Sequence, residues 1–139
     1  MVLDDLGTLL QAAGVGTLGA TLFKGRIPLD VPGGTAQHSL LALIEVPGMP
    51  SERVHDGRDA SVEQPMIQVV ARGLPHDYMD ARTRAQAAYE TLDGLTNVYL
   101  GTTFYREIWA QQPPFVLRQS DYLGGRIIVF TIRIAKAMA

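Results

Sequence analysis

The amino-acid sequence predicts a single α+β domain over residues 1–139, with a mixed, mostly antiparallel β-sheet that carries two main helices on one face. Three observations predict this fold class. A chain of 139 residues has the length of one domain, and its hydrophobic content of 47% is that of an ordinary folded protein. Segments with helical and strand periodicity follow one another in the order helix, strands, helix, strands. The chain has no cysteine, so its core has to hold the fold without disulfides or thiolate-bound metal.

The first predicted helix covers Val2–Ala13, where apolar side chains recur on one helical stripe. Asp4 and Asp5 fall in its first turn, where the helix dipole favours acids. Gly14 is a natural stop for this helix, and Leu22–Ile27 is predicted to form a short strand.

The run Leu6–Phe23 contains 18 uncharged residues, which is the length of a short membrane span. Its glycines, threonines and glutamine argue against a span, and acidic residues precede it where a secretory signal carries Lys or Arg. We therefore expect a soluble, unprocessed cytosolic product with no membrane partner.

Two further strands are predicted in the middle of the chain. Leu40–Val46 is nearly continuous in apolar residues, as expected of a strand covered on both faces, and Met66–Arg72 alternates as a strand does. Between them, Pro47–Gln64 loses the apolar period and gathers Pro, Gly and charges of both signs. This segment is predicted to be a long, mobile loop, and loops of this length are usually either functional or disordered.

The second predicted helix covers Tyr78–Leu92, with Asp77 as N-cap and Gly94 as the end signal. Three alanines on its buried stripe would allow close approach to a sheet. The rest of the chain is typical of a β-meander, with strands expected at Val98–Leu100, Phe104–Ala110, Phe115–Leu117 and Arg126–Ala135.

No motif indicates catalysis, a cofactor or a metal. The string GVGTLG, Gly14 to Gly19, matches the letters of a dinucleotide-binding fingerprint, but it follows a helix instead of a strand. We interpret it as a helix-to-strand connection. The histidines lack ligand spacing, and the serines lack a nucleophile-elbow context.

Interface residues are the more specific prediction. Glu45 lies on an apolar strand, and we expect it to be partly buried in an ion pair with an arginine at a sheet end or a subunit contact. Strict alternation in Phe104–Ala110 places Tyr105, Glu107 and Trp109 on one face. The terminal strand is apolar on both faces and includes Arg133. If the helices cover one face, a neighbouring subunit or the protein's own loops cover the other.

The charge balance adds little. Twelve basic and fourteen acidic residues give a net charge of -2, which predicts no general affinity for nucleic acid. Ten of the twelve basic residues are arginine, a residue suited to protein contacts, although genomic base composition produces the same bias.

Over most of its length the chain resembles the minor capsid or tail-terminator proteins of long-tailed bacteriophages and related prophages. The resemblance is carried by Leu3 to Gly19 and by the region around Glu45, Gly48, Pro50 and Glu52. It continues through Glu63 to Arg72, the positions Tyr78, Ala81 and Ala85, the run Leu92 to Val98, and Gln112, Pro113 and Phe115. Residues 28–39 match no pattern of the family.

The resemblance implies a non-enzymatic virion protein at the head-tail junction, assembled in the host cytoplasm. Such proteins cap the tail tube as a ring, commonly hexameric, and join it to the head-completion or connector protein. Double-stranded DNA passes through the lumen without specific binding, which suits a mildly acidic chain. In this interpretation the loop 47–64 orders on assembly, with Glu52, Arg53 and Arg58 as candidate ion-pair partners.

Two other functions remain open at this point. One is a monomeric module that binds a peptide or small ligand on its exposed sheet face. The other is a small nucleotide-dependent enzyme that uses Gly14 to Gly19. The ring stoichiometry, the surface that faces the head and the exact junction role do not follow from the sequence.

Overall fold

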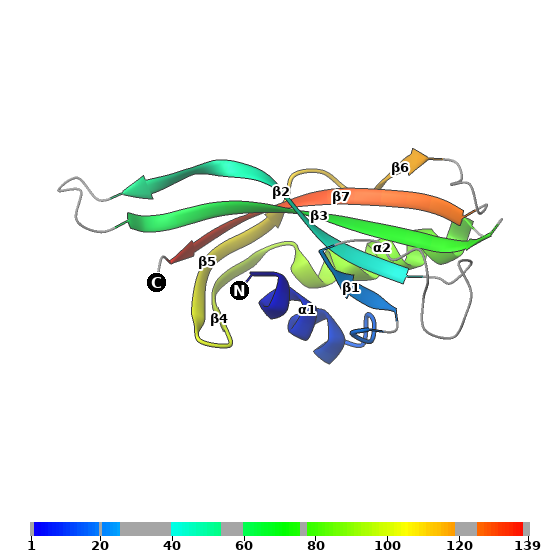
Figure 1. Cartoon of the computed structure of the whole chain (residues 1–139), viewed down its shortest axis with the longest axis horizontal. Helices are drawn as coiled ribbons and strands as arrows, with labels where there is room; N and C mark the ends of the chain where they lie inside the picture. The colour runs from blue at the N-terminus through cyan, green and yellow to red at the C-terminus, as the bar shows by residue number, and fades with distance from the viewer. Residues whose placement is uncertain are drawn as a thin grey trace.

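The β-sheet is the frame of the molecule, and both helices lie on the same side of it (Figure 1). The computed structural model describes residues 2–19, 21–25, 40–53, 60–75, 78–118 and 125–137. Within these ranges the elements are α1 Val2–Ala12, β1 Leu22–Lys24, β2 Leu40–Arg53, β3 Ala60–Pro75, α2 Tyr78–Leu92, β4 Leu95–Leu100, β5 Thr103–Ala110, β6 Phe115–Arg118 and β7 Gly125–Ala137. The predicted α+β class, with both helices on one face, is confirmed.

The sheet is mixed but mostly antiparallel. Its strand order is β1-β2-β3-β7-β5-β4, and β6 pairs with β7 beside β5. The pair β1–β2 is parallel, and the other pairs are antiparallel. Strand β7 is therefore central, with β3 on one side and both β5 and β6 on the other.

The main core lies between the sheet and the helices. Alternate side chains of β7 point to the helix side, where Ile128, Phe130, Ile132 and Ile134 are fully buried. Helix α2 packs mainly on β3 and β7, and α1 packs against β1, β2 and β4. The ring of Tyr89 on α2 meets that of Phe130 edge-on, with centroids 5.7 Å apart.

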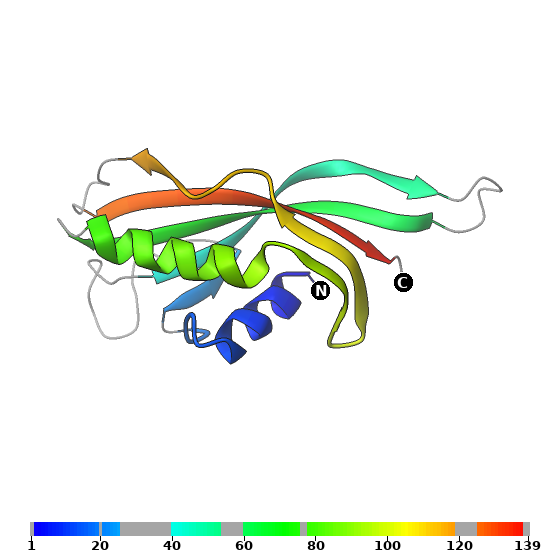
Figure 2. The ribbon, with the colours of Figure 1, turned by 180° about the vertical axis from the view of Figure 1, so that it is seen from behind.

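The buried stripe of α2 is built from small residues, as predicted. Ala81, Ala85 and Ala88 are completely buried, and Leu92 completes the stripe at the end of the helix. Gly94 follows with a φ of 84°, the left-handed conformation that glycine adopts without steric cost. The side of α2 that faces the sheet thus carries mainly small side chains, which allows the helix to pack close to β3 and β7 (Figure 2).

Helix α1 is fastened to the sheet by its acidic first turn. The hydroxyl of Tyr105 donates a hydrogen bond to Oδ2 of Asp5 at 2.5 Å. Lys24 on β1 forms an ion pair with Asp4, with Nζ and Oδ1 2.5 Å apart, and this contact lowers the pKa of Asp4. The two contacts join α1 to β5 and to β1, which are distant in the sheet.

The predicted loop Pro47–Gln64 is wrong for the residues that the structure describes. Strand β2 continues to Arg53 and β3 begins at Ala60, so the two strands form a long hairpin that extends beyond the helices (Figure 1). The ladder between them has irregular register after Val46. Such irregularities break the alternation of side chains, which explains why the sequence shows no strand period there.

The segment 28–39 and the predicted N-cap Asp77 lie outside the described residues. The predicted strand Leu22–Ile27 is confirmed for Leu22–Lys24 and ends there, because Gly25 is a bend with a φ of 93°; residues 26–27 lie outside the described residues.

Gly48 allows the two arms of the hairpin to approach each other. A Cβ atom at this position would lie 2.4 Å from the carbonyl oxygen of Gln64 and 3.0 Å from Cα of Pro65. Both contacts are with backbone atoms, which cannot move aside without shifting β3. The hairpin therefore requires glycine at this point in β2.

We predict that Gly48→Ala lowers the free energy of unfolding by about 1–3 kcal/mol, the usual cost of forcing atoms into a closed space. Chemical denaturation monitored by circular dichroism measures the change. Gly7→Ala is the matched control, because the Cβ would meet only side-chain atoms of Leu18 and Lys24. Equal stability of Gly48→Ala and the wild type would contradict the close approach.

We predict that Tyr105→Phe lowers the free energy of unfolding at pH 7 by about 0.5–1.5 kcal/mol, because Asp5 loses a hydrogen-bond donor. Burial, and then the hydrogen bond to Asp5, raise the pKa of Tyr105. The unfolded phenol ionises near pH 10, whereas the folded one keeps its proton. The contribution of the neutral phenol is thus complete below about pH 10 and is lost as pH rises toward the folded pKa.

Denaturation curves of the wild type and Tyr105→Phe at pH 7 and above pH 10 test this pH dependence. The difference in stability between the two proteins should shrink at the higher pH. Tyr99→Phe is the control, since the Tyr99 side chain is 71% exposed. A difference that is independent of pH would show that the phenol of Tyr105 is not held as described.

Candidate assembly surface

The side of the sheet that faces away from α1 and α2 is here called the second face. It has its own small buried cluster of Leu40, Ala42, Val70, Ile127 and Val129. Toward the hairpin the cluster gives way to half-buried side chains, among them Met66, Trp109 and Arg133. This part of the second face therefore offers both apolar and charged groups to a partner.

Arg133 is held on the second face by its neighbours. It lies directly opposite Trp109 in the β5–β7 ladder, and its guanidinium carbon is 5.2 Å from the centre of the indole ring. Its Nη2 donates a 3.4 Å hydrogen bond to Oε1 of Gln64 on β3. Cation–π contacts of this kind fix an arginine while leaving further N–H donors for a carboxylate.

The structure corrects the predicted faces of β5. The register of the β5–β7 pair shifts between Tyr105 and Glu107, as at a β-bulge. The bulge turns Tyr105 into the main core, where it is fully buried beside Ile108, while Glu107 and Trp109 remain on the second face. Tyr105 is thus a core residue whose hydroxyl fastens α1, and its ring is not at the surface.

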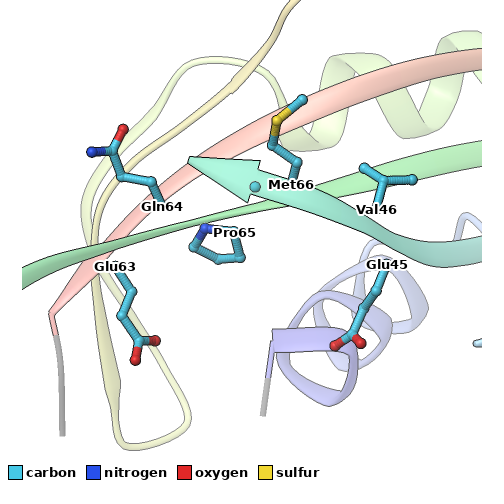
Figure 3. Close-up of a pocket in the computed structure, with 7 residues that line it drawn as sticks. Glu45, Val46, Glu63, Gln64, Pro65 and Met66 are labelled. Carbon is cyan, nitrogen blue, oxygen red and sulfur yellow. The ribbon is translucent and has the colours of Figure 1, made fainter. Parts of the chain in front are cut away.

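Glu45 is exposed, not partly buried as predicted. It lies on β2 on the helix side of the sheet, where Glu63 on β3 also lies, as Figure 3 shows. Glu63 pairs with Lys136 of β7, with Oε2 and Nζ 2.9 Å apart. Glu45 is the next helix-side position of β2 after Leu43, which is fully buried, so the covered part of this strand ends between the two residues. Among the described residues of this chain, Glu45 forms no ion pair with an arginine, and the alternative of a subunit contact stays a prediction.

A shallow groove of about 290 Å³ crosses the base of the hairpin. Figure 3 shows Glu45 and Glu63 on the side of α1, and Val46, Gln64 and Met66 on the opposite side. The groove is lined by Glu45, Val46, Gly48, Glu63, Gln64, Pro65 and Met66. The hairpin base is thus a thin element with different chemistry on its two sides.

The remaining predicted interface residues lie farther along the hairpin. Glu52 and Arg53 are on β2 opposite Val62 and Ala60. Arg58 lies outside the described residues. The structure brings Trp109 and Arg133 together, and it places Glu45 on the other side of the sheet.

Sequence reasoning did not identify Gly48, Gln64 and Met66, because all three were assigned to the loop or to its border. The available signal was chemical. A glycine between two prolines, at Pro47 and Pro50, is typical of an irregular edge strand as well as of a loop.

The glycine string Gly14 to Gly19 connects α1 to β1, as predicted. Gly14 and Gly19 have φ angles of 78° and 84°, so they form turns. A phosphate site would need the string to follow a strand and open a helix. Within the described ranges, no three His, Asp or Glu side chains gather in a way that suits a metal ion.

Neither helix in the described part of the chain has the length and apolar character needed to cross a membrane.

Comparison with known proteins identifies the family. A family model described as "Bacteriophage tail terminator protein" matches residues 9–135, which is most of the chain. The chain belongs to this family of tail terminators. It is therefore a structural protein of the bacteriophage tail, and its place is in the virion. The family's structural role argues against an enzyme.

A solved structure shares the fold of this tail terminator. It is titled "Virion of native gene transfer agent (GTA) particle", and one of its chains matches with a TM-score of 0.58 and 18% identity. The match covers 96% of this chain and 84% of that chain. No curated protein sequence matches the tail terminator described here.

We predict that Trp109 and Arg133 stabilise the sheet jointly, with a coupling energy of about 0.5–1 kcal/mol, as is usual for a partly exposed cation–π pair. A double-mutant cycle of Trp109→Ala and Arg133→Ala, followed by chemical denaturation, measures it. The control cycle pairs Trp109→Ala with Arg106→Ala, because Arg106 is exposed on the same strand. Strictly additive effects in the first cycle would contradict the contact.

Proposed function

We propose that this protein is the tail terminator that caps the tail tube as a ring, commonly of six subunits, and joins it to the head. The family match over residues 9–135 carries this proposal. In this role the partners are other copies of the chain, the tail tube protein and the head-completion or connector protein. The site of action is the head-tail junction of the virion, after assembly in the host cytoplasm.

The architecture supports a role in assembly. A ring subunit needs surfaces for its neighbours and a separate surface for the tube. The described chain has helices on one side of its sheet, a partly apolar second face and a hairpin that extends beyond the helices (Figure 1). Glu52 and Arg53 on this hairpin are suited to ion pairs with the tube or with a neighbouring subunit.

The charge of the chain supports passage of double-stranded DNA without specific binding. Each phosphate that Lys or Arg neutralises adds salt-dependent affinity, which would slow the movement of DNA through a lumen. A net charge of -2 gives little such affinity.

Addition of the purified protein to growing tail tubes tests the proposed function. We predict that elongation stops, and that negative-stain electron microscopy shows a ring at one end of each tube. The same tubes with buffer alone are the control. Continued elongation, with no density at the tube ends, would contradict the capping role.

A further inference from the structure

Two sides of the hairpin base differ in charge. On the helix side, Glu45 is exposed and forms no ion pair among the described residues, whereas Glu63 forms an ion pair with Lys136. On the second face, Arg133 is held by Trp109 and Gln64. These two surfaces lie on opposite sides of the sheet, with Glu45 on β2 and Arg133 two strands away on β7. Figure 3 shows the two sides for the residues of β2 and β3.

Among the described residues, no carboxylate forms an ion pair with Arg133. Glu107 is also on the second face, one same-face position beyond Trp109 along β5, but it forms no ion pair with Arg133. Met66 is half-buried nearby, opposite Arg133 in the β3–β7 ladder. The second face near the hairpin thus combines a fixed cation with an apolar surround, which is the composition of a protein contact.

Addition of a strand at the sheet edges is disfavoured. Beyond Leu43, β2 has no partner on its outer side among the described residues, and Pro47 and Pro50 there lack the N–H donors that a ladder needs. At the other edge, Asn97 in β4 has a φ of 50°, which interrupts the regular strand. The sheet faces are therefore better suited than the edges to join two copies.

A cyclic ring of more than two subunits requires two different surfaces that fit each other, because its contacts are head-to-tail. We propose that neighbouring copies of this chain contact through opposite sides of the sheet, with Glu45 at the hairpin base of one copy and the second face around Arg133 in the next. The carboxylate of Glu45 in one copy faces the guanidinium of Arg133 in the next, with Trp109 and Met66 packed around this pair. This contact specifies how subunits of the proposed ring would join, and it rests on the proposed function.

Charge reversal tests the contact. Glu45→Arg and Arg133→Glu should each weaken self-association at least tenfold, since each places like charges together. The double variant Glu45→Arg/Arg133→Glu should assemble again, and so should an equimolar mixture of the two single variants. Light scattering after size exclusion measures the assembly state. Glu90→Arg is the matched control, because it makes the same change of charge at an exposed position on α2. This variant should assemble as the wild type does.

The outcomes separate the contact from the capping role. Unchanged assembly of Glu45→Arg, whose side chain is exposed and whose folding is checked by circular dichroism, overturns the contact. Failure of both the mixture and the double variant to assemble also overturns it. If the wild type, Glu45→Arg and Arg133→Glu all cap tail tubes equally well, the contact is removed and the capping role remains. A wild type that assembles with the predicted charge dependence but does not cap tubes supports the contact and removes the capping role.

Discussion

The antiparallel ladder between β3 and β7 is the constraint on which the rest of the structure depends. It extends from the pair Val62–Ala137 to the pair Pro75–Gly125. Because side chains alternate along a strand, a slip of one residue would exchange the two faces of β7. Phe130 would then leave the core and Arg133 would enter it. The register thus determines where the helices pack and, by the same alternation, which groups the second face presents.

The hairpin of β2 and β3 is expected to have a lower local stability than the core of the sheet. At the helix end of β2, Leu41 and Leu43 are fully buried, whereas Glu45 and the residues next to it are exposed or half-buried. Segments with few buried apolar contacts open more easily than the core. A neighbouring subunit that covered the hairpin base would supply the missing contacts, so assembly and local stability would be coupled. This division leaves the hairpin available to partners without weakening the core.

The sequence was sufficient where one periodicity persists through an element. Helix α2 has the predicted bounds because its alanine stripe continues from Ala81 to Leu92, and β7 was found because its apolar run is long and nearly continuous. Where the backbone departs from regular alternation, the pattern misled. The bulge in β5 moved Tyr105 into the core, and the irregular register of β2 made a hairpin resemble a loop. The exposure of Glu45 depends on which distant elements pack over β2, which local sequence does not encode.

The contact between Trp109 and Arg133 could not be predicted from local sequence patterns either. Trp109 and Arg133 were identified separately as surface candidates, but their contact depends on the pairing of β5 with β7, and that pairing joins strands distant in the sequence. Stacking on the indole reduces the conformations open to Arg133, so less entropy is lost when a carboxylate binds it. A preorganised cation discriminates between partners by geometry as well as by charge. With Pro47 and Pro50 on the β2 edge disfavouring strand addition, side-chain contacts of this kind are left to set the arrangement of neighbouring subunits.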